Sequence, residues 1–562
     1  MKAVCLALAV AAACAAPSLR ALPVVKIPVD ADQSPIKDLR DSTCGPNMGY
    51  AGCLAEVSLY NDPFSVWAYG AGLAQTEKAL VACGAKLLRQ CNALEEWQRG
   101  MAKSWNRANP KAYFSLWKKL GIKVLLVIEC YGVYTDTTFT KRSNHPDVLR
   151  QAVRDFVGWI VRNKFEDVVA GFEMGNEPYF GNEPEIYAIR VETVMPEILK
   201  IMPKAKIGIP VAEYRAGDPD LAVVRKRLGE KKMMAGGGHF EINRLNQWSG
   251  RFVTALSNQI DRVSHVIYHF YGAERAYGAG AAGFERVHTF AKIYPQLADK
   301  RVWVTEWRER SDEDDRCHQA HFSTLWKAHY SLLALAQPNV DGFALHCIGS
   351  LAGALNIAMN CSTGPGQPWV PGFCFQSDPL GGFHFSPDPD GGRGIHRYEL
   401  GPTAPLYRMY TDALAGHPVL LEHGGVNGWG EKGPRWASVL YYESGKQQRL
   451  AVMRGAKELP QIMGNVEWLA ALDPGRTSVA VLMVNTLDEP AEAQFSSLRG
   501  RFAGPVKVKT LTCPAAYTYS YNVPGEPPLW SVAERRADAS GDRASVEIPA
   551  RAVQVVTLGL AK

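Results

Sequence analysis

The sequence predicts an α/β protein, with a (β/α)8 TIM barrel followed by a C-terminal antiparallel β-sandwich domain. Short apolar runs alternate with amphipathic segments eight times between about residues 45 and 417, which is typical of a parallel barrel with helices around it. After Pro418 the pattern changes to short alternating segments separated by turn residues, which indicates antiparallel strands. A doubly wound open sheet is the structural alternative, but it usually needs fewer units.

The barrel prediction rests on eight strand-then-helix units. In the segment 145–163, for example, Val148, Ala152, Phe156 and Ile160 recur at helical spacing. The expected strands cover 47–52, 84–90, 121–129, 168–174, 205–211, 262–272, 301–307 and 340–346. The expected helices cover 64–83, 110–120, 145–163, 185–202, 248–260, 284–297, 318–336 and 403–416.

Three parts of the chain are expected: a signal peptide over 1–16, the barrel over 17–417 and the sandwich over 418–562. A segment within 23–30 is a candidate additional strand of the sandwich. The other sandwich strands are expected over 436–444, 448–455, 478–486, 491–497, 506–512, 544–550 and 553–559.

The first sixteen residues have the pattern of a secretory signal peptide. Lys2 precedes an apolar run, and the small residues Ala13-Cys14-Ala15 form a cleavage site, so we expect a secreted or periplasmic protein. A lipoprotein signal with Cys14 as the lipidated residue is the alternative, which the Ala-rich run before it disfavours. No later run reaches ~18 apolar residues, so no membrane-spanning helix is expected.

Composition excludes some classes of partner. The chain has 562 residues, is 47% hydrophobic and 21% charged, and so has the balance of a folded globular protein. The formal net charge of +6 is spread without long Lys/Arg blocks, so nucleic-acid binding is not expected. A mildly basic surface is compatible with an anionic substrate.

Cysteine usage points to disulfides rather than to a metal. Without the two cysteines of the signal peptide, ten of the 12 remain, an even number in an exported chain. The chain has no CxxC pair and no Cys/His zinc spacing, so no metal is expected. Cys44 with Cys53 and Cys361 with Cys374 are candidate disulfides, whereas Cys83, Cys130 and Cys347 lie in apolar stretches and are expected to be buried thiols.

Two carboxylates are expected at opposite sides of the barrel mouth. Glu177 follows the fourth apolar run directly after Gly175-Asn176, and Glu306 ends the seventh. Catalytic groups of a barrel lie at the carboxyl ends of its strands, and strands four and seven face each other across the mouth. Retaining glycosidases need two such groups ~5–5.5 Å apart, one as acid/base and one as nucleophile.

At this point the chain resembles glycoside hydrolase clan A, the barrel glycosidases with catalytic Glu on strands four and seven. The likeness rests on Asn-Glu-Pro at 176–178 and on Thr-Glu-Trp at 305–307. The sandwich is similar to the accessory domain of families 30, 39, 51 and 79, without indicating one of them. The resemblance implies that Glu306 is the nucleophile and Glu177 the acid/base.

The same resemblance implies further site residues. Arg89, at the tip of strand two, would lie beside the nucleophile, and Asn176 would bind the sugar 2-hydroxyl. His269 and Tyr271 on strand six look like the His-x-Tyr pair of arabinofuranosidase-type members, with Tyr271 hydrogen-bonded to Glu306. Strand eight departs from the common pattern, because the chain has His346-Cys347 where many members have Trp.

Aromatic residues beside the two carboxylates complete the expected site. Tyr179 and Trp307 neighbour Glu177 and Glu306 in sequence and are candidates to stack on sugar faces. Glu129, at the end of strand three, either lines the cleft or is only a charge at a helix start.

The sequence therefore predicts a secreted retaining glycoside hydrolase that cleaves a polysaccharide or a derived oligosaccharide without a cofactor. The alternatives are a non-catalytic carbohydrate-binding protein on the same scaffold and an inverting enzyme or a transglycosylase. Asn-Glu-Pro could also be only a helix-start signal, with Glu177 favourable to the dipole. The Gly-rich run 278–283 matches a dinucleotide fingerprint in the wrong context, and the acidic run 312–315 lacks EF-hand spacing.

Overall fold

The computed structural model describes most of the two expected domains. In some strands, among them 54–58, 357–362, 394–400, 438–443 and 446–451, only the backbone is described. The residues described are 22–41, 54–58, 77, 80–102, 109–130, 132–136, 138–180, 182–212, 248–273, 294–310, 321–345, 357–362, 394–400, 402–426, 438–443, 446–451, 466–487, 489–513 and 530–561.

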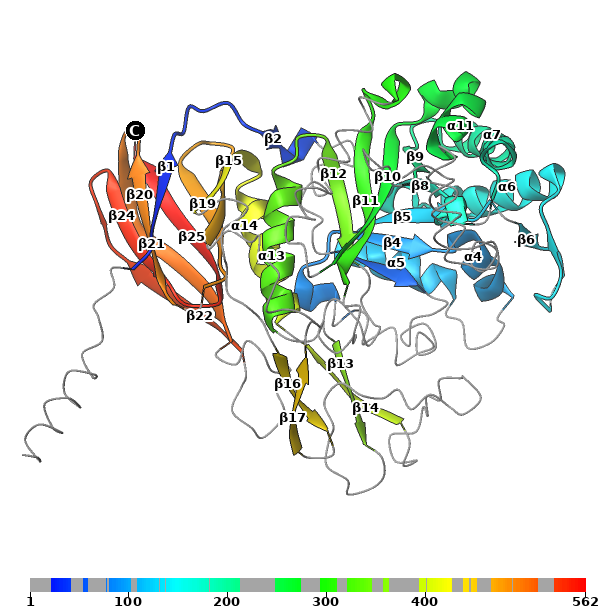
Figure 1. Ribbon diagram of the computed structural model, residues 1–562. Helices are drawn as coiled ribbons and strands as arrows, with labels where there is room; N and C mark the ends of the chain where they lie inside the picture. Colours follow the sequence, from blue (N-terminus) through cyan, green and yellow to red (C-terminus); the bar gives the residue numbers. More distant parts are fainter. Residues whose placement is uncertain are drawn as a thin grey trace, which may run out of the picture.

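Eight of the described strands form a closed barrel (Figure 1). Each is paired in parallel with the next along the chain, and the last pairs with the first. The prediction of a (β/α)8 fold is confirmed. The strands are β3 (Leu54–Ser58), β4 (Leu87–Cys91), β5 (Lys123–Ile128), β8 (Val169–Met174), β9 (Ile207–Pro210), β10 (His265–Ala273), β11 (Arg301–Arg310) and β12 (Val340–Leu345).

Helices follow the barrel strands, and their ends obey local rules. The side chain of Asn109 caps one helix by accepting the backbone N–H of Lys111, and Gly121 ends it with a φ of 65°. The described α-helices are α4 (Ala93–Met101), α5 (Pro110–Leu120), α6 (Pro146–Arg162), α7 (Pro184–Ile201), α11 (Trp248–Ala255), α13 (His321–Leu335) and α14 (Thr403–Gly416). The 3-10 turns are η1 (Leu39–Asp41), η3 (Glu166–Val168), η4 (Pro178–Phe180), η5 (Ser257–Arg262) and η6 (Pro295–Leu297).

The structure corrects two expectations for the barrel. Its first strand is β3, not 47–52, which lies outside the described residues. β3 carries Glu56 opposite Arg89 of β4, so a polar residue interrupts the apolar run by which strands are recognised. α4 was not expected, because its buried face includes Glu95 and Glu96. Of the helix expected over 284–297, only the turn η6 lies among the described residues.

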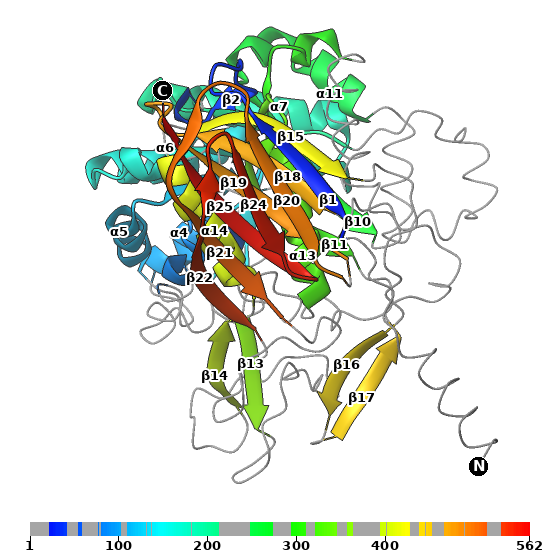
Figure 2. The same cartoon turned by 90° about the vertical axis from the view of Figure 1, so that its left-hand side faces the viewer.

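The second domain is a β-sandwich of two sheets (Figures 1 and 2). One sheet has the order β1-β20-β24-β23, and the other has the order β2-β15-β18-β19-β25-β21-β22. The expected sandwich is confirmed. Its strands are β1 (Val24–Val29), β2 (Lys37–Asp38), β15 (Val419–Val426), β18 (Val466–Leu472), β19 (Ser478–Asn485), β20 (Ala491–Ser497), β21 (Arg501–Thr512), β22 (Ser531–Ala537), β23 (Ala539–Ser540), β24 (Arg543–Ile548) and β25 (Ala552–Ala561).

The N-terminal segment belongs to this sandwich. β1, within the expected range 23–30, pairs with β20 in parallel, whereas the other described pairs of the two sheets are antiparallel. In Figure 2, β1 lies along the four-stranded sheet. The chain thus crosses from the sandwich to the barrel and back again.

The segments expected over 436–444 and 448–455 do not join the sandwich sheets. They form β16 (Ser438–Glu443) and β17 (Lys446–Ala451), which pair only with each other among the described strands. Figure 1 shows this hairpin below the body, beside a second one. The other two-stranded sheets are β13 (Ile357–Ser362) with β14 (Gly394–Leu400) and β6 (Val133–Tyr134) with β7 (Arg142–Ser143).

α13 and α14 connect the two domains through a common core. Both helices contact β19 and β25 of the seven-stranded sheet (Figure 1). Leu482 of β19 therefore belongs to the same buried cluster as the barrel core, whereas Met483, on the opposite face, belongs to the sandwich core. Glu467 of β18 is buried and hydrogen-bonded to His329 of α13.

The described cysteines are thiols. Cys83 and Cys130 are fully buried, as expected, and Cys91 and Cys513 are also buried thiols. The candidate disulfide pairs and Cys347 lie outside the residues whose side chains are described, so those disulfides stay a prediction. In the described part of the chain, no helix combines the length and the apolar character needed to cross a membrane.

Candidate active site

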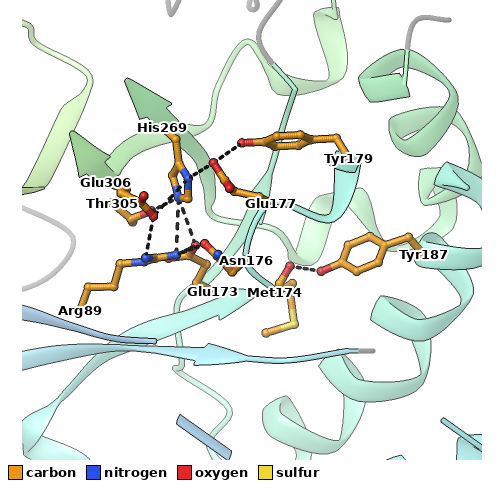
Figure 3. Close-up of polar contacts among 10 residues, drawn as sticks. All are labelled: Arg89, Glu173, Met174, Asn176, Glu177, Tyr179, Tyr187, His269, Thr305 and Glu306. Atoms are coloured by element: carbon orange, nitrogen blue, oxygen red, sulfur yellow. Dashed lines mark hydrogen bonds and ion pairs between the residues drawn. The ribbon is translucent and has the colours of Figure 1, made fainter. Parts of the chain in front are cut away.

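Five of the expected site residues meet at the carboxyl ends of the barrel strands (Figure 3). Arg89 comes from β4, Asn176 and Glu177 follow β8, His269 comes from β10, and Glu306 comes from β11. These five residues were expected from the sequence, and hydrogen bonds and ion pairs connect all of them.

The base of the site is a buried ion pair between Arg89 and Glu173. The guanidinium donates from Nη2 to Oε1 at 2.7 Å and from Nε to Oε2 at 2.9 Å, and both side chains are fully buried. Burial disfavours the charge of Glu173, but the charges and hydrogen bonds of Arg89 and His269 together outweigh it and hold the pKa of this carboxyl below its usual value. The bidentate contact fixes the orientation of the guanidinium.

Arg89 positions two of the other groups. Its Nη1 donates to Oε2 of Glu306 at 3.2 Å, and its Nη2 donates to Oδ1 of Asn176 at 2.8 Å. The positive charge favours the ionised form of Glu306, and the guanidinium holds the side-chain oxygen of Asn176.

The loop after β8 holds Glu177 in a strained backbone conformation. Gly175 has a φ of 78°, and a Cβ at this position would lie 2.1 Å from the hydroxyl of Tyr187, which donates to the carbonyl of Met174. Glu177 itself has a φ of 45°, which is uncommon for a residue with a side chain. The turn directs Glu177 back over the mouth, where its side chain is 26% exposed.

His269 lies between the two catalytic carboxylates. Its Nδ1 is 3.1 Å from Oε1 of Glu177 and 3.5 Å from Oε2 of Glu306, and its Nε2 is 3.1 Å from the hydroxyl of Thr305. The register between β10 and β11 shifts directly before His269, which makes it the backbone partner of Glu306. The irregularity thus places the imidazole beside both carboxylates.

The spacing of the two carboxylates suits a retaining mechanism. One oxygen of Glu177, one of Glu306 and one ring nitrogen of His269 lie within 4.8 Å of one another. Retaining glycosidases separate their carboxyl groups by ~5–5.5 Å and inverting ones by ~6.5–9.5 Å.

The imidazole of His269 is charged in this arrangement. Burial opposes the charge, but the carboxylates of Glu306, Glu173 and Glu177 outweigh it and raise the pKa of His269 to about 10. Both ring nitrogens then carry protons. Burial also opposes the charge of Glu177, yet the hydrogen bond and charge of His269, together with Arg89 and Tyr179, outweigh it and lower the pKa of Glu177.

The structure also shows the surroundings of two further groups, the hydroxyl of Tyr179 and the carboxyl of Glu129. The hydroxyl of Tyr179 donates to Oε1 of Glu177 at 3.3 Å, and burial together with Glu177 raises the pKa of this hydroxyl well above its usual value, so it stays a donor. Glu129 is 3% exposed and does not line the cleft; burial and the charge of Glu95 raise the pKa of Glu129 to about 8.

The expected sugar contact of Trp307 does not fit the structure. Its ring is fully buried and stacks on Tyr330 of α13 with 4.1 Å between ring centroids, so it packs between β11 and the helix instead of facing the mouth. Tyr179 is 5% exposed and packs edge-on against Trp248, so it offers its hydroxyl rather than its ring face. The side chain of Tyr271 lies outside the described residues, as do His346, Cys347 and the runs 278–283 and 312–315.

Sequence reasoning missed Glu173 and Thr305. Glu173 lies inside an apolar strand, and an arginine expected at the end of a buried strand needs a buried counter-charge. Glu173 is a charged residue near the carboxyl end of the apolar run 168–174. The buried counter-charge of Arg89 could therefore have been found from the sequence.

The comparisons with known proteins agree with this architecture. No family model matches the chain, and no curated protein does. The α-L-arabinofuranosidase of Thermotoga maritima is 12% identical with a TM-score of 0.58, and the match covers 95% of this chain and 99% of that one. The GH51 α-L-arabinofuranosidase of Thermotoga petrophila RKU-1 is 12% identical with a TM-score of 0.59 over the same shares.

A third similar structure is CelM2, a bifunctional glucanase-xylanase from a metagenome library. It is 10% identical with a TM-score of 0.53, and the match covers 96% of this chain and all of that one. The likeness is one of fold. It extends over the barrel and the sandwich together and confirms the architecture that the resemblance to clan A implied.

Proposed function

We infer that the protein is a retaining glycoside hydrolase that cleaves glycosidic bonds in a polysaccharide or a derived oligosaccharide. The observation that carries this inference is the approach of Glu177 and Glu306 to within 4.8 Å at the barrel mouth, with Arg89 donating to Glu306. The similar structures support it, because they are described as arabinofuranosidases and a glucanase-xylanase. Glycosides of arabinose, xylose and glucose are therefore the first substrates to test.

The roles of the two carboxylates follow from their surroundings. Glu306 is 7% exposed and held by Arg89, so it is the ionised nucleophile that attacks the anomeric carbon. Glu177 is more exposed and acts on the leaving oxygen, first as an acid and then as the base that activates water. Asn176, whose side-chain oxygen accepts a hydrogen bond from Arg89, is assigned the contact with the sugar 2-hydroxyl.

Substitution of the two carboxylates tests this function. On aryl arabinofuranosides, xylosides and glucosides, Glu306→Gly should lose activity by more than about 10³-fold. Azide should restore turnover of this variant and give a glycosyl azide of inverted configuration. Glu177→Ala should lose roughly 10²–10⁴-fold on substrates with poor leaving groups and much less on dinitrophenyl glycosides, which need no acid.

Glu166→Gln provides a matched control, because Glu166 is exposed and lies in the turn before β8. It should behave like the parent protein. Near-full activity of Glu306→Gly without azide, or a first product of inverted configuration from the parent protein, would contradict the proposal. A protein that binds these sugars but cleaves none of them would support a carbohydrate-binding function instead.

A further inference from the structure

A groove of about 740 Å³ separates the C-terminal half of α14 from the seven-stranded sheet of the sandwich. α14 forms one wall, and β21, β22 and β25 form the other. Figure 1 shows α14 between the barrel strands and the sandwich. Protein sites that hold small ligands have volumes of ~300–1,000 Å³, so the groove is large enough for a short segment of a polymer.

The groove lies near the end of the barrel opposite the candidate active site. Asp412 of α14 lines both this groove and a smaller cavity, which the segment 84–86 and Ile122 also line. These residues directly precede β4 and β5, so they mark the amino ends of the barrel strands. Glu177 and Glu306 lie at the carboxyl ends, and the groove is therefore a separate site.

Two cations face each other across the sheet wall of the groove. Lys507 and Lys509 of β21 alternate with Val508, which belongs to the sandwich core, and share a face with Leu511, which belongs to the barrel cluster. Lys507 lies directly opposite Arg536 of β22. Like charges in this position destabilise a sheet. Among the residues that the structure describes, no carboxylate lies within ion-pair distance of Lys507 or Arg536.

The carboxylates of the groove are already paired with other cations. Glu534 of β22 pairs with Lys509 at 3.1 Å, and Asp412 pairs with Arg408 of its own helix at 2.9 Å. Neither of them therefore offsets the two opposed cations. The groove has an excess of positive charge, and it also has carboxylate oxygens that can accept hydrogen bonds.

Protection of an exposed strand does not explain this arrangement. Cations on an edge strand such as β22 often serve only to prevent pairing with another chain. Arg535, on the opposite face of β22, donates to the carbonyl of Glu547 in the four-stranded sheet. Lys507, in contrast, lies one strand in from the edge and on the face toward α14. A cation at this place does not block the edge.

We propose that this groove binds a segment of a uronate polysaccharide, a sugar chain with about one carboxylate per residue. Lys507 and Arg536 hold a carboxylate of the chain, and the oxygens of Glu534 and Asp412 accept hydrogen bonds from its hydroxyl groups. The phosphates of a nucleic acid or of a lipid surface only accept hydrogen bonds, so the same two carboxylates repel them. The inference goes beyond the proposed function, because it assigns a second site that tethers the protein to a polymer and needs no catalysis.

Binding to acidic polysaccharides tests this inference. Glu306→Gly serves as the background in these measurements, because it should not degrade the probes. Calorimetric titration at low salt should show binding of polygalacturonate or of alginate. The methyl ester of polygalacturonate has the same chain without the charges and should bind at least about tenfold more weakly. Added salt should weaken the binding of polygalacturonate as well, since it screens exposed charges.

Variants of the groove locate the binding site. Lys507→Gln combined with Arg536→Gln should weaken the binding of polygalacturonate by at least about tenfold, because charge-assisted hydrogen bonds are lost. Lys204→Gln combined with Arg262→Gln is the matched control, since it removes the same charges from exposed positions before β9 and β10. Lys507→Glu separates binding from stability. It places a carboxylate opposite Arg536, so the thermal midpoint should stay or rise while binding is lost.

Activity separates this proposal from the proposed function. With Glu306 retained, the groove variants should cleave aryl glycosides like the parent protein, and absence of cleavage in all of them refutes only the glycosidase function. The groove proposal is overturned if neither acidic polysaccharide binds, or if the combined substitution of Lys507 and Arg536 leaves their binding unchanged. Tighter binding of double-stranded DNA or of phosphatidylserine vesicles through these residues would also overturn it, in favour of a phosphate-bearing partner.

Discussion

Strain at single residues of the site is concentrated in the turn after β8. Gly175 and Glu177 both have positive φ, and the side-chain oxygen of Asn176 between them accepts a hydrogen bond from Arg89. A strained backbone persists only where surrounding contacts enforce it. Here the hydroxyl of Tyr187 packs against Gly175, and His269 and Tyr179 hold the carboxylate of Glu177. The conformation of Glu177 is thus fixed before a substrate arrives.

Gly175→Ala should therefore damage both stability and activity. The added methyl group would lie 2.1 Å from the hydroxyl of Tyr187, so the turn has to move, and with it Asn176 and Glu177. We expect a loss of more than about 2 kcal/mol in urea unfolding and a fall in kcat/KM of more than about tenfold. Gly121→Ala is the matched control, because its φ of 65° is similar but nothing lies within 4 Å of the added methyl group; it should cost about 1 kcal/mol without affecting kcat/KM. Equal losses of stability and of kcat/KM in the two variants would show that the positive φ, and not the contact with Tyr187, causes them.

The sequence indicated those residues of the site that stand out as charged residues at the ends of apolar runs. Glu177 and Glu306 end apolar runs, and Arg89 is charged at the end of another, so their strand positions predict convergence. The position of His269 between the two carboxylates could not be predicted, because it depends on a register shift between β10 and β11. Trp307 was misassigned for a related reason: the residue after a catalytic strand position points to the opposite side of the strand, here toward α13.

At the scale of elements, the sequence predicted those strands whose residues follow one simple pattern of apolar and polar residues. The buried barrel strands and the alternating strands β20 and β24 follow simple patterns. β18 was missed because it is buried along its whole length, between α13 and the opposite sheet, and shows no alternation. β22 was missed for the opposite reason, since it is an edge strand that is mostly exposed. β16 and β17 alternate as sandwich strands do, and only tertiary pairing shows that they form a separate hairpin.

The contact between α13 and β18 has a pH dependence that can be measured. Glu467 is buried against His329; burial disfavours its charge, but the charge and hydrogen bond of His329 outweigh it and lower the pKa of Glu467 from 4.5 to about 2. A carboxyl whose pKa is lower in the folded than in the unfolded state stabilises the fold above the unfolded pKa. This stability is lost as the pH falls from about 4.5 through about 2.

Glu467→Gln should accordingly destabilise the protein by about 3 kcal/mol in urea unfolding at pH 7. The difference from the parent protein should shrink to less than about half of this value at pH 3, because the carboxyl of the unfolded chain is then protonated and only part of the pKa difference still contributes. Glu534→Gln is the control: Glu534 pairs with Lys509 at the surface and is 71% exposed, so the change should stay within about 0.5 kcal/mol. A difference for Glu467→Gln that is the same at pH 7 and pH 3 would contradict this account.

At the scale of the whole molecule, the barrel and the sandwich share buried surface. The cluster that contains the barrel core also includes four residues of the sandwich, namely Leu469, Ala471, Leu482 and Val555. The N-terminal segment is part of the sandwich through β1, before the chain enters the barrel. The strand within 23–30 was expected from the sequence, whereas the shared buried surface was not, since it depends on which face of a sheet meets which helix. The seven-stranded sheet is buried on both faces, so exposing either face would be costly. The two domains should therefore unfold together.

Met483→Ala tests this cooperativity. Met483 is fully buried in the sandwich core and faces away from the barrel, and its truncation should cost about 2–5 kcal/mol. If the two domains unfold as one unit, calorimetry shows one endotherm for the parent protein, and this variant moves the whole endotherm to a lower temperature. Met101→Ala, at an exposed methionine at the end of α4, should leave the endotherm in place. Two separated endotherms, of which Met483→Ala shifts only one, would show that the shared core does not couple the domains.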